Sequence, residues 1–344
     1  MVVKGRIYMS KKATLEQWEE LYNLVLKIDQ KQPWLQYWDQ DLFAIETKQE
    51  NEPYFISIMG KASKCIGLVT YKGMEGFSDF CQVCDEEYNL TGDFVMSDQN
   101  CLTAYWGPQE YIDDESLEII EKLGIQFKDD ENWIYFKTFE KKSFPSLPNY
   151  AEVNQLIEVY KGFLFALEND MTNFEEGDIS YTKKDEDGDW VNYSLPRPIE
   201  PDRYYHIFIE NSVINDLKEL EESDIELAID FDYTMFPVSD EGFERPINPL
   251  AYILYDLRED AIINFDLIHP DQEDYQVILD SVIGVMHQFG LPKHIYAKNP
   301  YILNWLDYLC KQLNIELIKD DIQEVDEIFS DLKQLDMFME NAEE

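Results

Sequence analysis

The sequence is short of basic residues. Its 344 residues include 28 Lys and Arg against 71 Asp and Glu, which gives a net charge of −43. Because nucleic-acid binding needs Lys and Arg to neutralise phosphates, direct binding to DNA or RNA is not expected. Residues 1–150 carry 15 basic and 26 acidic residues (net −11), whereas residues 151–344 carry 13 and 45 (net −32). A protein partner of the second half is therefore expected to be basic.

Long apolar runs, cysteines and histidines are also scarce. No run of about 18 apolar residues occurs, so no membrane span is expected, and "MVVKGRIYMSKK" lacks the apolar stretch of a signal peptide. The 5 cysteines, an odd number, are typical of reduced thiols in the cytoplasm. The 4 histidines show no HExxH spacing, and no GxSxG, P-loop or GxGxxG motif occurs. Nucleophilic catalysis and nucleotide binding therefore have no support from motifs.

Aromatic residues, in contrast, are abundant. They make up 14% of the chain, within a hydrophobic content of 45%, which indicates a folded protein despite the charge. The length suffices for two domains that each bury a core. So acidic a surface raises the alternative of a DNA-mimicking inhibitor, whose carboxylates imitate phosphates, but the large aromatic content weighs against it.

The first half has the pattern of an α+β domain, which we place over 1–170. "TLEQWEELYNLVLKI" (14–28) is typical of a helix, with Thr14 as N-cap and Gln17 completing a capping box. Further helices are expected at 74–88, 113–125 and 149–170, and strands at 42–47, 53–60, 65–73, 100–107 and 132–140.

An acidic linker or hairpin is expected over 171–200. Its "KKDEDGDW" run looks like a calcium loop, but Lys183 would take the first ligand position and Ser194 the place of the bidentate Glu. An Asp-Gly hairpin turn is the better interpretation.

The second half, 201–344, has the pattern of an α/β domain with a mixed sheet. Strands are expected at 204–210, 226–233, 250–257, 260–268, 294–297 and 315–318, and helices at 211–222, 274–290, 300–313 and 322–339. A hairpin followed by alternating helices and strands predicts antiparallel neighbours first and parallel neighbours later.

One run in this domain resembles the RNase H-like cores of integrases and transposases. There, Gly-x-Pro-x-x-Ile-x-x-Asp-Asn places a catalytic carboxylate at the end of a strand, and "GLPKHIYAKN" (290–299) has Lys298 at that position. Acids from several strands must converge to hold two metal ions. Asp256 is the candidate for the first carboxylate, Asp230 and Asp232 end the preceding strand, and Asp326 is a candidate for the third with its neighbour Glu327.

A cation at position 298 indicates a degenerate site, so the domain resembles an RNase H-like core that has lost its metal chemistry. No cofactor is expected, or at most weak Mg²⁺ or Mn²⁺ binding at Asp230, Asp232 and Asp256. The "CQVC" run (81–84) supplies only half of a zinc site and is expected to be two thiols on a helix.

The whole chain also resembles an uncharacterised two-domain family found mainly in bacteria. The resemblance lies in "WEELYNLVLKIDQKQPWLQYWDQDLFAI", "YFISIMGKASKCIGLVTYKGMEGF", "WIYFKTFEKKSFPSLPNYAEV", "RPINPLAYILYDL" and "GLPKHIYAKNPYILNWLDYLCKQLNIEL". The chain departs from the family pattern in "MGKASKCIG", where the next glycine waits until Gly67. The resemblance implies the division into two domains and no reaction, cofactor or catalytic residue.

The first domain offers a set of candidate binding residues, because strand-end glycines allow close backbone approach and paired tryptophans line grooves. Alternatively, the glycines make turns and the tryptophans fill a core. The set is Trp34, Trp38, Gly60, Tyr71, Gly73 and Gly76.

The leading functional hypothesis is a cytoplasmic, non-catalytic binding module with a strongly acidic C-terminal domain. The enzymatic alternative is a divalent-metal nuclease or phosphodiesterase centred on Asp256, and the third hypothesis is the DNA mimic.

Overall fold

The structure is a computed structural model that describes residues 11–48, 52–62, 65–85, 90–169, 177–239 and 242–343, with side chains up to residue 334. The chain forms two compact units, each built on a mixed sheet. The first comprises Met1–Cys84, Asp98–Lys141 and Pro145–Pro201, and the second Asp85–Ser97, Lys142–Phe144 and Asp202–Glu344. The units do not strictly follow the chain, because two short segments of the first half belong to the second unit.

The first unit contains a seven-stranded sheet in the order β5-β4-β3-β2-β1-β6-β7. Its strands are β1 (Phe43–Glu46), β2 (Tyr54–Met59), β3 (Ile66–Lys72), β4 (Cys101–Gly107), β5 (Trp133–Phe139), β6 (Asp178–Lys184) and β7 (Trp190–Pro196). Neighbouring strands are antiparallel, except for the parallel pair β1 and β6. Its helices are α1 (Leu15–Lys31), α2 (Gly73–Cys84), α4 (Asp114–Leu123) and α5 (Tyr150–Glu168), with 3₁₀ turns η1 (Pro33–Leu35) and η2 (Gln109–Tyr111).

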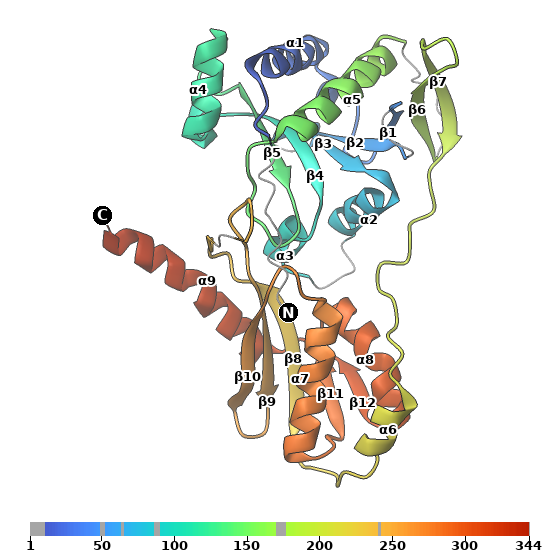
Figure 1. The fold of residues 1–344 in the computed structure, drawn as a ribbon, viewed down its shortest axis with the longest axis vertical. Coiled ribbons are helices and arrows are strands. Elements are labelled where there is room, and N and C mark those ends of the chain that lie inside the picture. Colours follow the sequence, from blue (N-terminus) through green and yellow to red (C-terminus); the bar gives the residue numbers. More distant parts are fainter. Residues whose placement is uncertain are drawn as a thin grey trace. The chain divides into compact units, whose positions relative to one another are not determined.

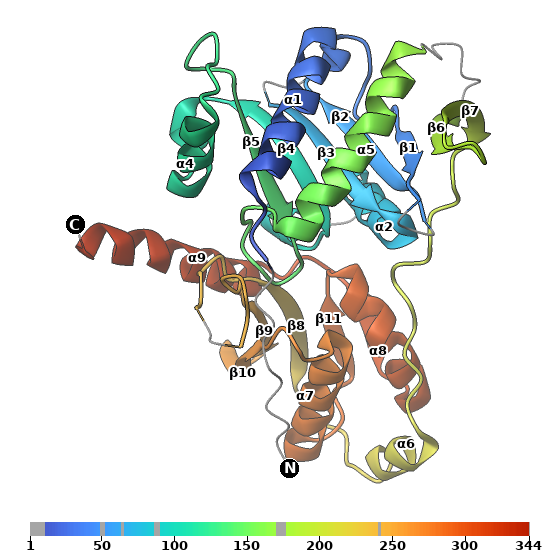
Figure 2. The same cartoon turned by 45° about the horizontal axis from the view of Figure 1, so that its top comes forward.

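Helices cover both faces of this sheet (Figures 1 and 2). Alternate residues of a strand point to opposite faces. Ile56 of β2 belongs to the core beneath α1 and α5, whereas its neighbour Phe55 belongs to the core beneath α2. The close fit extends to Gly162 of α5, where an added Cβ would lie 2.6 Å from Ile45 Cγ2.

The predicted helix cap and the predicted hairpin turn are both present in the structure. Thr14 and Gln17 form the predicted capping box at the start of α1. The predicted Asp-Gly hairpin is confirmed, since β6 and β7 pair from Lys184 opposite Trp190 and Gly188 turns with φ +93°. This hairpin lies within 171–200, the predicted acidic linker or hairpin, and extends the first sheet alongside β1.

The second unit contains a five-stranded sheet in the order β10-β9-β8-β11-β12. Its strands are β8 (Glu226–Tyr233), β9 (Leu250–Asp256), β10 (Ala261–Ile268), β11 (His294–Ala297) and β12 (Glu316–Lys319). The first three are antiparallel neighbours, and β8, β11 and β12 are parallel. Its helices are α3 (Gly92–Ser97), α6 (Asn211–Leu217), α7 (Asp274–Phe289), α8 (Pro300–Leu313) and α9 (Gln323–Glu343).

The two faces of this sheet carry different helices. Side chains of α7 and α8, such as Val282 and Leu306, pack on the face that includes Ile229. Ile322, which directly precedes α9, and Val325 of α9 pack on the opposite face, over Ile253 and its neighbours.

Two features of the second unit differ from the sequence expectation. The strand predicted at 204–210 is wrong, because this segment has no strand partner and is irregular. Its alternation reflects packing instead, since Ile207 and Ile209 pack against the core while Phe208 is exposed. The short helix α3 was not expected, and its buried Phe94 packs 5.5 Å, centroid to centroid, from the ring of Phe231.

Candidate functional site

Two acidic side chains are buried at the centre of the second sheet. Asp230 and Asp232 of β8 are only 3% and 4% exposed. Because they alternate with Phe231, which belongs to the core under α7 and α8, both carboxylates point to the face that α9 covers. Buried carboxylates require a partner, and each has a lysine.

Lys298 is the partner of Asp230. Tyr296 of β11 lies opposite Ala228 of β8 in a parallel pair, so two residues further along both strands bring positions 298 and 230 together. The Nζ of Lys298 lies 3.6 Å from Oδ2 of Asp230 and forms a second ion pair with Asp326 of α9. The next residue, Asn299, caps α8, which fixes the chain at this point.

Lys333 is the partner of Asp232. It lies seven residues after Asp326 on α9, and helical residues at that spacing share a face. The Nζ of Lys333 lies 2.9 Å from Oδ2 of both Asp232 and Asp93, and the hydroxyl of Thr91 also donates to Asp232, over 3.0 Å. Each lysine thus joins two carboxylates, and together these residues form the lysine–carboxylate face: Asp93, Asp230, Asp232, Lys298, Asp326 and Lys333.

Burial sets the electrostatics of this face. It raises the pKa of Asp230 to about 7, although Lys298 and the backbone N–H of Phe231 favour the charged carboxylate. Burial by itself lowers the pKa of Lys298, but Asp230 and Asp326 outweigh it, so the pKa of Lys298 lies above its usual value. The pKa of Lys333 is raised in the same way by Asp232 and Asp93. Both lysines therefore stay charged at neutral pH.

The structure does not bring together the three acids predicted as metal ligands. Asp256 of β9 lies opposite Leu227 of β8, whose side chain belongs to the core under α7 and α8. Directly paired residues share a face, so Asp256 points away from Asp230 and Asp232. Within the described residues, no group of three or more His, Cys, Asp or Glu side chains is arranged to hold a metal ion.

The sequence pattern did not point to Lys333, Asp93 or Thr91. The signal for Lys333 was present, because it is the one basic residue in α9 and follows Asp326 at heptad spacing. Asp93 and Thr91 come from a segment far away in the chain, and no local pattern relates them to β8.

The predicted binding residues of the first unit lie in separate places. Trp34 is buried against Trp106, with ring centroids 4.8 Å apart, and a Cβ on Gly60 would lie 3.0 Å from Trp34 Cβ. Trp38, by contrast, is 49% exposed, with Lys61 Nζ 4.7 Å from its ring centroid.

The other three lie at the opposite end of the β2–β3 pair. Tyr71 is buried and pairs with Phe55, while Gly60 follows the far end of β2. Gly73 has φ +64° at the turn into α2, and a Cβ on Gly76 would lie 3.0 Å from Tyr71 Cβ. These glycines serve a turn and close packing.

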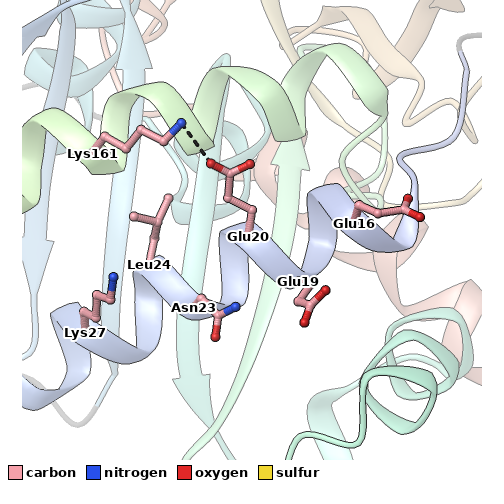
Figure 3. Close-up of a pocket in the computed structure, with 7 residues that line it drawn as sticks. All are labelled: Glu16, Glu19, Glu20, Asn23, Leu24, Lys27 and Lys161. Atoms are coloured by element: carbon pink, nitrogen blue, oxygen red, sulfur yellow. Dashed lines mark ion pairs between the residues drawn. The ribbon is translucent and has the colours of Figure 1, made fainter.

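A shallow hollow lies on the outer surface of α1 and α5, with a volume of about 500 Å³ (Figure 3). It is lined mainly by charged side chains, and Lys161 Nζ forms an ion pair with Glu20 over 2.9 Å. The lining residues are Glu16, Glu19, Glu20, Asn23, Leu24, Lys27 and Lys161. Leu24 is the one apolar side chain among them, whereas ligand pockets are lined mainly by hydrophobic and aromatic side chains.

Comparison with known families agrees with the division into two parts. Residues 18–185 match a domain of unknown function (DUF7309), and residues 213–333 match a second domain of unknown function (DUF6930). These two domains of unknown function together cover most of the chain. This agrees with the resemblance to a two-domain family, and neither description names a reaction. No curated protein matches the chain. In the part of the chain that the structure describes, no helix has the length and apolar character of a membrane span.

Proposed function

We propose that the protein is a non-catalytic interaction module whose acidic second domain binds a basic protein partner. The pairing of both buried carboxylates with lysines of the same chain supports the non-catalytic part of this proposal. A divalent cation would need the oxygens that Lys298 and Lys333 already contact. Displacing either lysine would leave its ammonium group without a counter-charge in the interior, which is costly. We therefore assign the lysine–carboxylate face a role in stabilising the fold and not in metal-dependent cleavage. The proposed module uses no cofactor.

The same geometry supports a degenerate RNase H-like core for the second domain. The order β10-β9-β8-β11-β12 has an antiparallel meander on one side and two parallel, helix-connected strands on the other. Asp230, Lys298 and Asp326 come from the middle strand, the end of the adjacent parallel strand and the last helix. A two-metal nuclease would need acids that converge in this way. Here Lys298 occupies one of the three positions, between Asp230 and Asp326.

The charge of the second domain supports a basic partner. Around α6 and the following loop, five exposed acids stand close together in the chain: Asp216, Glu219, Glu221, Glu222 and Asp224. A surface of one sign attracts and orients a partner of the opposite sign. The proposal places the protein in the cytoplasm, which the odd number of cysteines supports.

A direct test uses the full chain and two short labelled peptides, one alternating lysine with valine and the other glutamate with valine. Fluorescence anisotropy should show binding of the lysine peptide, weakening as salt is raised, and no binding of the glutamate peptide. Equal binding of both peptides, or of neither, would overturn the proposal.

A further inference from the structure

The strand β10 is the end strand of the second sheet. One of its edges pairs with β9, and it stands last in the strand order. A single bulge lies between Ile262 and Asn264, after which the pairing runs regularly to Ile268. Its sequence, AIINFDLI, contains none of the lysines or prolines that usually keep edge strands from pairing with other chains.

The two faces of β10 are covered unequally. On the face of α7, Asn264 donates to the hydroxyl oxygen of Ser281 over 2.8 Å, and Ile268 is buried. On the opposite face, Ile262, Phe265 and Leu267 are 50%, 42% and 46% exposed. These three pair with Tyr255, Ile253 and Ala251 of β9, which α9 covers. Among the described side chains, the cover provided by α9 therefore stops at β9 and leaves an apolar row on β10.

The surroundings of this row are acidic. Between 256 and 273 the chain has one basic residue, Arg258, which pairs with Asp224. The same stretch has six acids, and Glu324 of α9 lies near Tyr255. These six are Asp256, Glu259, Asp260, Asp266, Asp271 and Glu273.

We infer that the outer edge of β10, which pairs with no strand among the described residues, is the docking site for an extended, basic segment of a partner protein, which adds to the sheet as a further strand. Backbone hydrogen bonds to the edge would supply affinity. Apolar side chains of the segment would cover Phe265 and Leu267, and its lysines or arginines would face Asp260 and Asp266. This inference deepens the proposed function and rests on it.

A second copy of the chain fits the edge poorly. Each copy carries a net charge of −43, and pairing two edges would bring Asp260 and Asp266 of both copies together. Like charges across an interface cost free energy, whereas a basic segment removes this cost.

The test again uses the full chain and the lysine–valine peptide, with two further reagents. One is the same peptide N-methylated at every backbone amide, which keeps its charge but has no N–H group to donate to the edge of β10. The other is the double variant Phe265→Asn/Leu267→Asn, matched by the control Glu110→Gln/Glu121→Gln, which neutralises two exposed acids of the first unit. We expect the β10 variant and the methylated peptide each to weaken binding at least tenfold, and the control to change it less than about twofold.

The outcomes separate the two proposals. Binding that survives methylation and the β10 variant would overturn the edge site and leave a diffuse acidic interaction. Loss of binding in the control variant alone would move the site to the first unit and would also overturn the edge site. No binding of the lysine peptide to the wild type overturns both. Sedimentation of the unliganded protein tests whether a second copy of the chain occupies the edge of β10. A dimer that the β10 variant abolishes would identify a second copy as the occupant and overturn the inference of a basic partner.

Discussion

Lys298 stands beside Asp230, with its Nζ 3.6 Å from Oδ2, and at the same time contacts Asp326. One buried ammonium group thus joins the middle strand, the end of β11 and the last helix of the second domain. Lys298 therefore opposes metal binding at this site and, at the same time, helps to hold α9 on the sheet.

Replacing Lys298 by methionine should destabilise the second domain. Asp230 would lose its cation while remaining buried, and removing one partner of a buried pair costs about 3–5 kcal/mol. Because Asp230 takes up a proton readily, we expect the lower end of that range for the free energy of unfolding, measured by urea denaturation. Lys311→Met is the control, since that lysine is exposed and pairs with Asp307 four residues earlier. Equal small losses for both variants would contradict a structural role for Lys298.

The titration of Asp230 should appear in the pH dependence of stability. Its pKa is about 7 in the folded protein and 3.8 in the reference state. Between these values the folded state holds a proton that the unfolded state has released, so this group lowers the free energy of unfolding as pH rises from about 4 to about 7. The Asp230→Asn variant has no carboxyl group at this position, so it does not show this fall in the free energy of unfolding. The stability of the variant relative to the wild type should therefore increase across this window and level off above it.

Urea unfolding at a series of pH values measures this difference, and the repulsion among the many other acids largely cancels in the comparison. The exposed Ser330→Ala variant, which removes no titratable group, is the control and should show no such trend. A constant difference between Asp230→Asn and the wild type would mean that Asp230 is ionised throughout.

Replacing Lys298 by aspartate should create a divalent-metal site. The substitution would put three carboxylates in place of an ion pair, at positions 230, 298 and 326, and oxygen ligands of this kind bind Mg²⁺ and Mn²⁺. We expect Mn²⁺ to raise the melting temperature of Lys298→Asp, since a ligand that binds the folded state stabilises it, and to leave Lys298→Asn unchanged. Calorimetry provides the stoichiometry. A stoichiometric Mn²⁺ site in the wild type, lost in Asp230→Asn, would instead revive the nuclease hypothesis.

Two glycines within helices should respond in opposite directions to alanine. At Gly162 a Cβ would lie 2.6 Å from Ile45 Cγ2 and 2.9 Å from the ring of Trp190, so overpacking should destabilise the first domain by about 1–3 kcal/mol. At Gly284 of α7 the added Cβ would have no described atom within 4 Å apart from its chain neighbours and the backbone of its own helix. Alanine there should stabilise the second domain by about 0.5–1 kcal/mol through helix propensity. Differential scanning calorimetry checks both, and the same sign for the two variants would contradict the packing around α5.

The sequence alone determined the features that depend on neighbours along the chain. Caps such as Thr14 with Gln17, the Asp-Gly turn at Gly188 and the alternation in β8 each involve a few adjacent residues, so their patterns are readable without a fold. Lys298 was also found from a local pattern, because it follows a short strand at the position where the RNase H-like motif has an aspartate.

Only the tertiary structure decided which of these elements meet. Asp256 was expected to join Asp230, but strand register turns it to the other face, and no local pattern encodes register between strands. Residues 204–210 alternate like a strand, yet a strand needs a partner, and this segment packs its apolar side chains without one. Asp93 and Lys333 are 240 residues apart in the sequence and reach the same carboxylate region only because α3 and α9 both pack beside β8. Such contacts depend on how distant segments share one core, which a sequence pattern of a few residues does not record.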